Sequence, residues 1–403
     1  MSKQNKKKPN KRVRGAHFRM KLLVGISIAT VLLIAILVTV LVFVLGGGRS
    51  VMTVNSKGIS RELYCYWSSY GKYVYLSQNG GNDTPAFWAS DNGSGVTHAE
   101  ACKKDTEAYM VQMLVSAELY DSIGGKLSES EREALSRRAE AVLQYDVSSR
   151  SAYDKLAKQY GFSYSTMCEA LIYSYKNEVL RTVMTGTDGS SLTDAQLEHY
   201  YEQAYTRALI LEVRTENYYK YDEEGDIIQN SDGTYKLFTM TDAEKAAAQA
   251  KIERITAALT SDGSLESFEE LYETENEDVL RGLYADGYFF SEVSGFSEYF
   301  AESLPAESDD VLEGILSQET NSWSLYDAGN RSLIVYVTGT TERPYESETN
   351  EDFFHDLAKH AADYFYAKTL GDEIEDAKVT YDREFTDSLR FSDVAFDYRL
   401  FFR

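Results

Sequence analysis

The pattern of apolar and polar residues divides the chain into four parts. Residues 22–45 are an unbroken apolar run without charge, and residues 60–204 place apolar side chains at helical spacing. The stretch RALILEV (207–213) alternates as a strand does, with Ala208, Ile210 and Glu212 on one face. Residues 350–376 return to helical spacing. This order predicts an α+β protein with an apolar span at its start.

The apolar run predicts a transmembrane helix. Its 24 residues would extend over about 36 Å as a helix, more than a hydrocarbon core of about 30 Å. A cleaved signal peptide is the alternative, but its apolar core has only about 7–15 residues and a small-residue cleavage site. The basic flank 1–21 holds nine Lys or Arg and is expected to stay cytoplasmic, with residues 46–403 outside.

Helix starts recur along 46–204, which we expect to form a helical domain. A hydroxyl side chain is followed three residues later by Glu or Gln at four places: Thr97–Glu100, Ser128–Glu131, Thr166–Glu169 and Thr193–Gln196. In such a capping box, the two side chains bond each other's backbone N–H groups. Ser60 is expected to be the N-cap of an earlier helix.

A small α+β domain is expected at 205–340. It would begin with RALILEV, continue through an inserted hairpin at 214–240 and a helix capped by Thr241, and close with a strand at Leu333–Val337. The last segment, 341–403, holds the helix at 350–376 and an aromatic tail, FDYRLFFR. Because an exposed aromatic tail favours aggregation, we expect it to pack on the rest of the chain or to contact a partner.

Charge and rare residues exclude several functions. Residues 51–403 hold 31 basic and 64 acidic residues, which argues against nucleic acid as a partner. Three cysteines do not make a disulfide framework; a Cys65–Cys102 bridge and plain buried thiols both stay open. His355 and His360 are five residues apart, whereas a helical zinc pair needs a spacing of four. We expect neither a metal nor another cofactor.

Three stretches carry a family resemblance: VNSKGISRELYCYW (54–67), the helical run 160–184, and FEELYETENEDVLRGLYADGYFFSEVSGF (268–296). They resemble extracytoplasmic foldases of the SurA and PrsA type. The resemblance implies a helical chaperone domain of the SurA N-terminal kind, an inserted parvulin-type prolyl isomerase domain, and a C-terminal helix that packs back on the helical domain.

The resemblance also implies where a site would lie. Leu209 stands where the first strand of active parvulins has His, and Ser332 or Leu333 stands at the second His; none of the five His lies in 205–340. Asp278 falls at a family Asp or Cys and is the weak catalytic candidate, together with Phe296, which matches the Phe of the proline pocket. The implied peptide-binding set is Leu209, Phe289, Val293, Phe296 and Leu333. A solvated loop acid and ordinary core aromatics are the alternatives.

These observations favour a membrane-anchored chaperone or foldase that binds unfolded exported polypeptides, with a parvulin-like domain of weak or no activity. Two alternatives stay open: an active peptidyl-prolyl isomerase with an altered pocket, and a non-catalytic scaffold of the envelope. The expected location is the cell membrane, crossed once by Leu22–Leu45, with the C-terminal domains extracellular.

Overall fold

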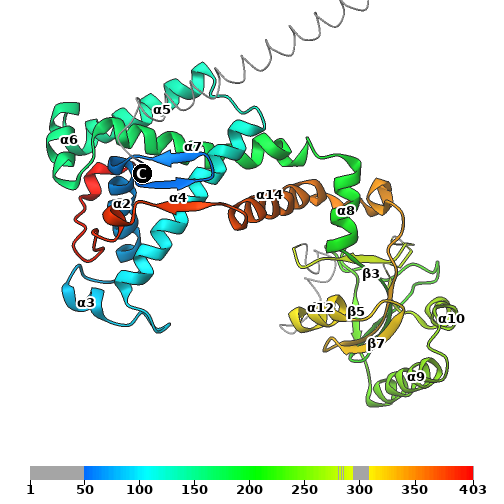
Figure 1. The fold of residues 1–403 in the computed structure, drawn as a ribbon. Coiled ribbons are helices and arrows are strands. Elements are labelled where there is room, and N and C mark those ends of the chain that lie inside the picture. The colour runs from blue at the N-terminus through cyan, green and yellow to red at the C-terminus, as the bar shows by residue number, and fades with distance from the viewer. Residues whose placement is uncertain (1–49, 280, 283, 285, 294–307, 403) are drawn as a thin grey trace, which may run out of the picture. The chain divides into compact units, whose positions relative to one another are not determined.

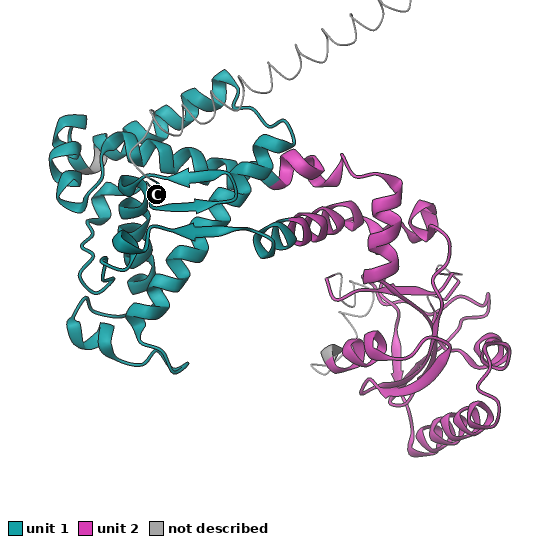
Figure 2. Ribbon diagram, viewed as in Figure 1, with its two compact units in different colours: residues 1–180, 370–403 teal, residues 181–369 magenta. Residues whose placement is uncertain are grey.

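A computed structural model describes residues 50–279, 281–282, 284, 286–293 and 308–402. The chain forms two compact units, which Figure 2 colours separately. The helical unit takes residues up to Leu180 together with Leu370–Arg403, and the sheet unit takes Arg181–Thr369. The expected cytoplasmic tail and transmembrane helix lie outside the described residues. Within the described ranges, no helix combines the length and the apolar character that a membrane crossing needs.

The helical unit begins with a short antiparallel sheet. Its strand order is β2 (Lys57–Ile59), β1 (Met52–Val54) and β9 (Val379–Tyr381), so the end of the chain pairs with its beginning. The helices follow in chain order: α2 Arg61–Asn79, α3 Pro85–Ala89, α4 His98–Ser122, α5 Glu129–Val142, α6 Arg150–Ala157, α7 Tyr164–Thr185 and, near the C-terminus, α15 Arg383–Thr386. Figure 1 shows β9 beside the N-terminal hairpin.

Most of the predicted helix starts are confirmed. Ser60 caps α2, and complete capping boxes begin α4 at Thr97, α5 at Ser128 and α8 at Thr193. The prediction at Thr166 is wrong, because α7 begins at Tyr164. Ser163 and Thr166 bond each other there, with Ser163 N donating to Thr166 Oγ1 at 3.3 Å.

The aromatic tail packs back on the helical unit. The Phe401 ring lies 5.6 Å from the ring of Tyr66 and 5.4 Å from that of Tyr70 on α2. The buried Lys72 donates to the backbone oxygen of Val394 at 2.6 Å. These contacts bury Phe401, whereas Tyr398 of the same tail stays 52% exposed.

The sheet unit is built on four antiparallel strands in the order β6, β3, β8, β7. Their bounds are β3 Thr206–Arg214, β6 Tyr288–Phe290, β7 Ser322–Asp327 and β8 Arg331–Thr338. The predicted alternation of β3 is confirmed: Leu209 and Leu211 pack under α9 (Asp242–Ser261) and α10 (Leu265–Glu275), whereas Ala208 and Ile210 belong to the opposite face. Figure 1 shows these helices on one side of the sheet and α12 (Ser308–Ser317) on the other.

Three further elements complete the sheet unit. The hairpin in 214–240 is confirmed, with β4 (Asn217–Tyr219) paired antiparallel to β5 (Leu237–Thr239). The helix expected at 350–376 is divided into α13 (Glu351–Phe354) and α14 (Leu357–Glu375). α8 (Asp194–Ala204) precedes β3.

The sheet unit is larger than the expected 205–340. It also takes in 181–204 and 341–369, because aromatic side chains from both flanks pack on β6. The ring of Phe354 lies 5.0 Å and that of Tyr201 6.3 Å from the ring of Phe289 on β6. Leu357 and Ala361, near the start of α14, belong to this same core. The chain re-enters the helical unit at Leu370, within the last part of α14.

Candidate functional site

A buried cluster of charges lies on β3 and β8. The Glu212 carboxylate accepts from Arg331 Nη1 at 2.8 Å and lies 3.0 Å from Arg214 Nη2. The three residues are only 3%, 5% and 4% exposed. Burial raises the pKa of Glu212, and the two guanidinium groups oppose that rise. Because a charge removed from water needs a partner, the three groups hold each other in place.

The inserted hairpin is fastened to this cluster. Arg214 donates from Nη1 to Asn217 Oδ1 at 2.8 Å and from Nη2 to the Tyr219 hydroxyl at 2.7 Å. Its guanidinium carbon also lies 4.2 Å from the centre of the Tyr219 ring. The base of the hairpin therefore has a fixed position on the sheet.

A loop at 276–278 runs along the edge of β3 that β6 leaves uncovered. Asn276 Nδ2 donates to the backbone oxygen of Ile210 at 2.9 Å, and Glu277 N donates to that of Glu212 at 2.9 Å. Asp278 accepts a hydrogen bond from the Tyr288 hydroxyl. Burial, and then the Asp278 carboxylate, raise the pKa of Tyr288 well above its ordinary value, so this hydroxyl stays protonated.

An open cleft of about 870 Å³ separates the hairpin from this loop. Its side chains combine carboxylates with aromatic and aliphatic groups. The hairpin contributes Tyr221, Asp222, Asp226, Ile227, Ile228 and Tyr235, and the loop contributes Asn276, Glu277, Asp278, Val279 and Arg281. The volume is in the upper part of the range of about 300–1,000 Å³ that is usual for ligand sites.

The chain is similar to solved structures of the foldase PrsA. The protein from Streptococcus pneumoniae shares 17% identity over 74% of this chain and 98% of that one, with a TM-score of 0.20. PrsA from Bacillus subtilis shares 16% identity over 73% of this chain and 91% of that one, with a TM-score of 0.20. The Lactococcus lactis protein shares 12% identity over 86% of this chain and 100% of that one, with a TM-score of 0.21. No protein-family model and no curated protein matches the chain. Similarity at this level indicates nothing about activity, so the residues themselves must carry the functional conclusion.

The structure divides the peptide-binding set that the PrsA-type resemblance implies. Leu209 is buried under α9, whereas Leu333 is fully buried on the opposite face of the sheet. No single surface contains both. Phe289 and Val293 do come together, as part of the wall of a second cavity of about 180 Å³. Phe296 lies outside the described residues.

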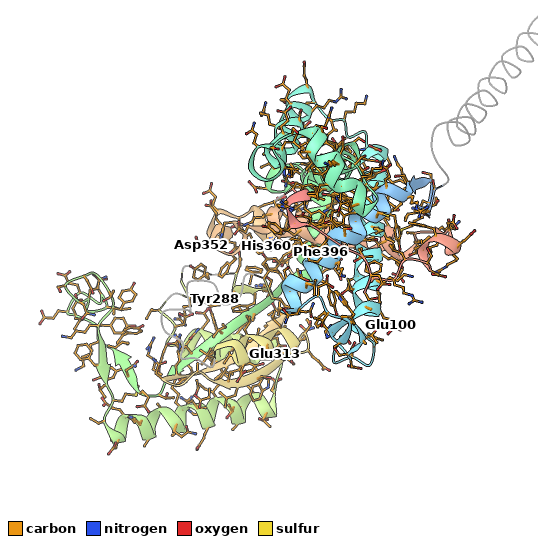
Figure 3. All side chains as sticks on the ribbon, turned by 90° about the vertical axis from the view of Figure 1, so that its left-hand side faces the viewer. Glu100, Tyr288, Glu313, Asp352, His360 and Phe396 are labelled. Atoms are coloured by element: carbon orange, nitrogen blue, oxygen red, sulfur yellow. The ribbon has the colours of Figure 1, made fainter. Side chains whose placement is uncertain are left out.

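The second cavity is lined by aromatic and by polar side chains. Tyr205, Phe289 and Phe353 face it, together with a partly exposed Val293. Its polar residues are Asp352, His355, Asp356 and His360, two of which Figure 3 labels. The His355 Nε2 atom lies 3.4 Å from Asp356 Oδ2. In the described parts of the chain, no group of three or more His, Cys, Asp or Glu side chains is placed to hold a metal ion.

Sequence reasoning missed the charge cluster, although it singled out Asp278, which lines the cleft. The signal was present as Glu212 within an otherwise apolar strand, on the face of Ala208 and Ile210. Arg331 lies 119 residues further on, and nothing in the local pattern of either strand indicates that the two charges meet. Chemically, the cluster pairs the single carboxylate of Glu212 with the guanidinium groups of both Arg214 and Arg331.

Proposed function

We propose that the chain is a membrane-anchored extracytoplasmic chaperone that binds unfolded exported polypeptides, and that its parvulin-like unit has weak or no isomerase activity. The observation that carries the proposal is that the charges of Glu212, Arg214 and Arg331 are buried and paired, whereas the cleft between the hairpin and the loop is open and lined by aromatic and acidic side chains. The paired charges argue against catalysis, and the open cleft favours binding.

Prolyl isomerisation requires a site that favours the twisted amide. The rotational barrier of about 18–20 kcal/mol arises from amide resonance, and a catalyst lowers it only through interactions that strengthen in the transition state. The positions that the resemblance assigns to histidines hold Leu209 and either Ser332 or Leu333. Both leucines are buried and apolar, and Ser332 is half-buried. The charges of Glu212, Arg214 and Arg331 on the same two strands already pair with one another.

Polypeptide binding needs exposed groups that tolerate many sequences. Tyr221 and Tyr235 are 61% and 43% exposed on the cleft's hairpin wall. Tyrosine combines a large apolar ring with a polar tip, and ordering it on binding costs little conformational entropy. Residues 22–45 would hold the chain at the membrane, and the basic flank before them would keep the N-terminus cytoplasmic.

Suppression of aggregation tests this function. The full-length chain, in a mild detergent, is mixed with an unrelated enzyme that is then heated, and light scattering is followed. A chaperone lowers the scattering in proportion to its concentration, and detergent alone does not. A chain that leaves the scattering unchanged with several unrelated clients, and instead co-purifies with one protein, would be a scaffold.

A further inference from the structure

The cleft beside the inserted hairpin has two firm walls. The base of the hairpin is held at Arg214, as described above, and is closed by Met240 N, which donates to the backbone oxygen of Glu216 at 3.0 Å. On the loop side, Asn276 Oδ1 accepts from Glu212 N at 2.8 Å, and Arg281 Nη1 donates to the backbone oxygen of Tyr272 at 2.8 Å. Both walls are thus tied to the strand β3 or to the helix beside it.

The lining carries an excess of negative charge. Its carboxylates belong to Asp222, Asp226, Glu277 and Asp278, and Arg281 is the cation among the lining residues. Glu277 already pairs with Lys251 at 2.6 Å. In contrast, no Lys or Arg of the described residues forms an ion pair with Asp222 or Asp226, and Asp222 Oδ1 accepts only from backbone N–H groups of its own turn.

Exposed aromatic side chains line the same cleft as these two carboxylates. Tyr221 and Tyr235 are both exposed there, and the Tyr235 ring is supported by an edge-to-face contact with Tyr219 at 5.8 Å. A cation is attracted to the face of such a ring and to a neighbouring carboxylate at the same time. Lysine and arginine side chains match this combination, because their stems cover apolar surface while their heads stay in water.

We propose that the cleft between the 217–239 hairpin and the loop residues 276–279, 281 and 282 binds an extended polypeptide segment that carries lysine or arginine. The inference rests on the proposed function and names the class of client. Charge complementarity favours this occupant, since Asp222 and Asp226 lack a cation within the described chain and an acidic segment would be repelled. The volume is sufficient for several residues of an extended chain and not only for one side chain.

The test uses two short, unstructured, fluorescently labelled peptides of Gly, Ser and Ala, one carrying four lysines and the other four glutamates at the same positions. Binding to the full-length chain is followed by fluorescence anisotropy. The lysine peptide is expected to bind at least about tenfold more tightly at low salt, and this preference should shrink when salt shortens the Debye length to a few ångströms.

A pair of matched variants locates the site. Asp222→Asn with Asp226→Asn removes two charges from the lining, and Asn at 222 keeps the oxygen that the turn needs. Glu223→Gln with Glu224→Gln removes two charges from the same turn outside the lining. The first variant should weaken binding of the lysine peptide by about fivefold or more, given the usual strength of exposed ion pairs. The second should change binding by less than about twofold.

The outcomes separate the inference from the proposed function. Equal binding of both peptides, or equal losses in both variants, would overturn the inference. If aggregation is suppressed while the lysine peptide gains nothing from Asp222 and Asp226, the chain is a chaperone that holds its clients elsewhere. If neither effect is seen, both proposals fail.

Discussion

The charge cluster of the sheet unit makes a quantitative prediction about stability. Glu212→Gln keeps the size and one acceptor oxygen of the side chain but removes the charge that faces Arg331 and Arg214. All three groups are at most 5% exposed, so water cannot replace the lost partner. Leaving buried charges unpaired costs about 3–5 kcal/mol, a large part of the roughly 5–15 kcal/mol that stabilises a typical domain.

Urea unfolding is the suitable assay, because urea does not screen ion pairs as a guanidinium salt does. Trp323 is the sole tryptophan in the sequence of the sheet unit, since Trp67 and Trp88 lie in the helical unit. The fluorescence difference between each protein and its Trp323→Phe counterpart therefore reports unfolding of the sheet unit. The expected loss corresponds to a fall in melting temperature of about 6–20 °C.

Glu216→Gln is the matched control. Glu216 pairs with Lys245, but its side chain is 52% exposed, and exposed pairs contribute about 1 kcal/mol or less. A loss below about 1 kcal/mol for Glu212→Gln, or one equal to that of the control, would refute the view that these charges are buried and mutually dependent.

Three further predictions concern the helical unit. Lys72→Met should speed hydrogen exchange in 391–402, since the backbone oxygens of Ser392 and Val394 lose a buried donor worth about 1–3 kcal/mol; unchanged exchange would contradict the docked tail. Arg399 holds the pKa of Asp397 below its usual range, so the stability that this carboxylate contributes at neutral pH is lost as pH falls below about 4. Asp397→Asn should therefore flatten the acid side of the unit's stability curve, and an unaltered curve would count against this pairing. Burial raises the pKa of Cys102 to about 12, so its thiol should react with iodoacetamide more slowly than the half-buried Cys65 and Cys168, and mass spectrometry without reductant should find three free thiols.

Local patterns in the sequence predicted the elements better than they predicted the site. The alternation in RALILEV and the capping boxes at Thr97, Ser128 and Thr193 depend on neighbouring residues, and the structure has them. Thr166 has the same local spacing, yet it lies inside α7, where its N–H donates to the hydroxyl of Ser163, the residue before the helix, at 3.4 Å.

The site depends on longer-range relations. Whether Leu209 and Leu333 share a face is decided by the register of β3 against β8, in which Leu209 faces Tyr336 and Leu333 faces Glu212. A shift of one residue in register moves every side chain of a strand to the other face. A loose resemblance does not align the two sequences to within one residue. The cleft is equally non-local, because it forms between the inserted hairpin and a loop that follows α10.

One refolding experiment tests the central claim, which is binding without isomerisation. A client whose refolding is limited by a slow X-Pro step is refolded with and without the full-length chain, beside a histidine-containing parvulin, and both the yield and the rate of the slow phase are recorded. We expect the chain to raise the yield and to leave that rate unchanged, whereas the parvulin accelerates it. A slow phase that accelerates with increasing concentration of this chain would contradict the account.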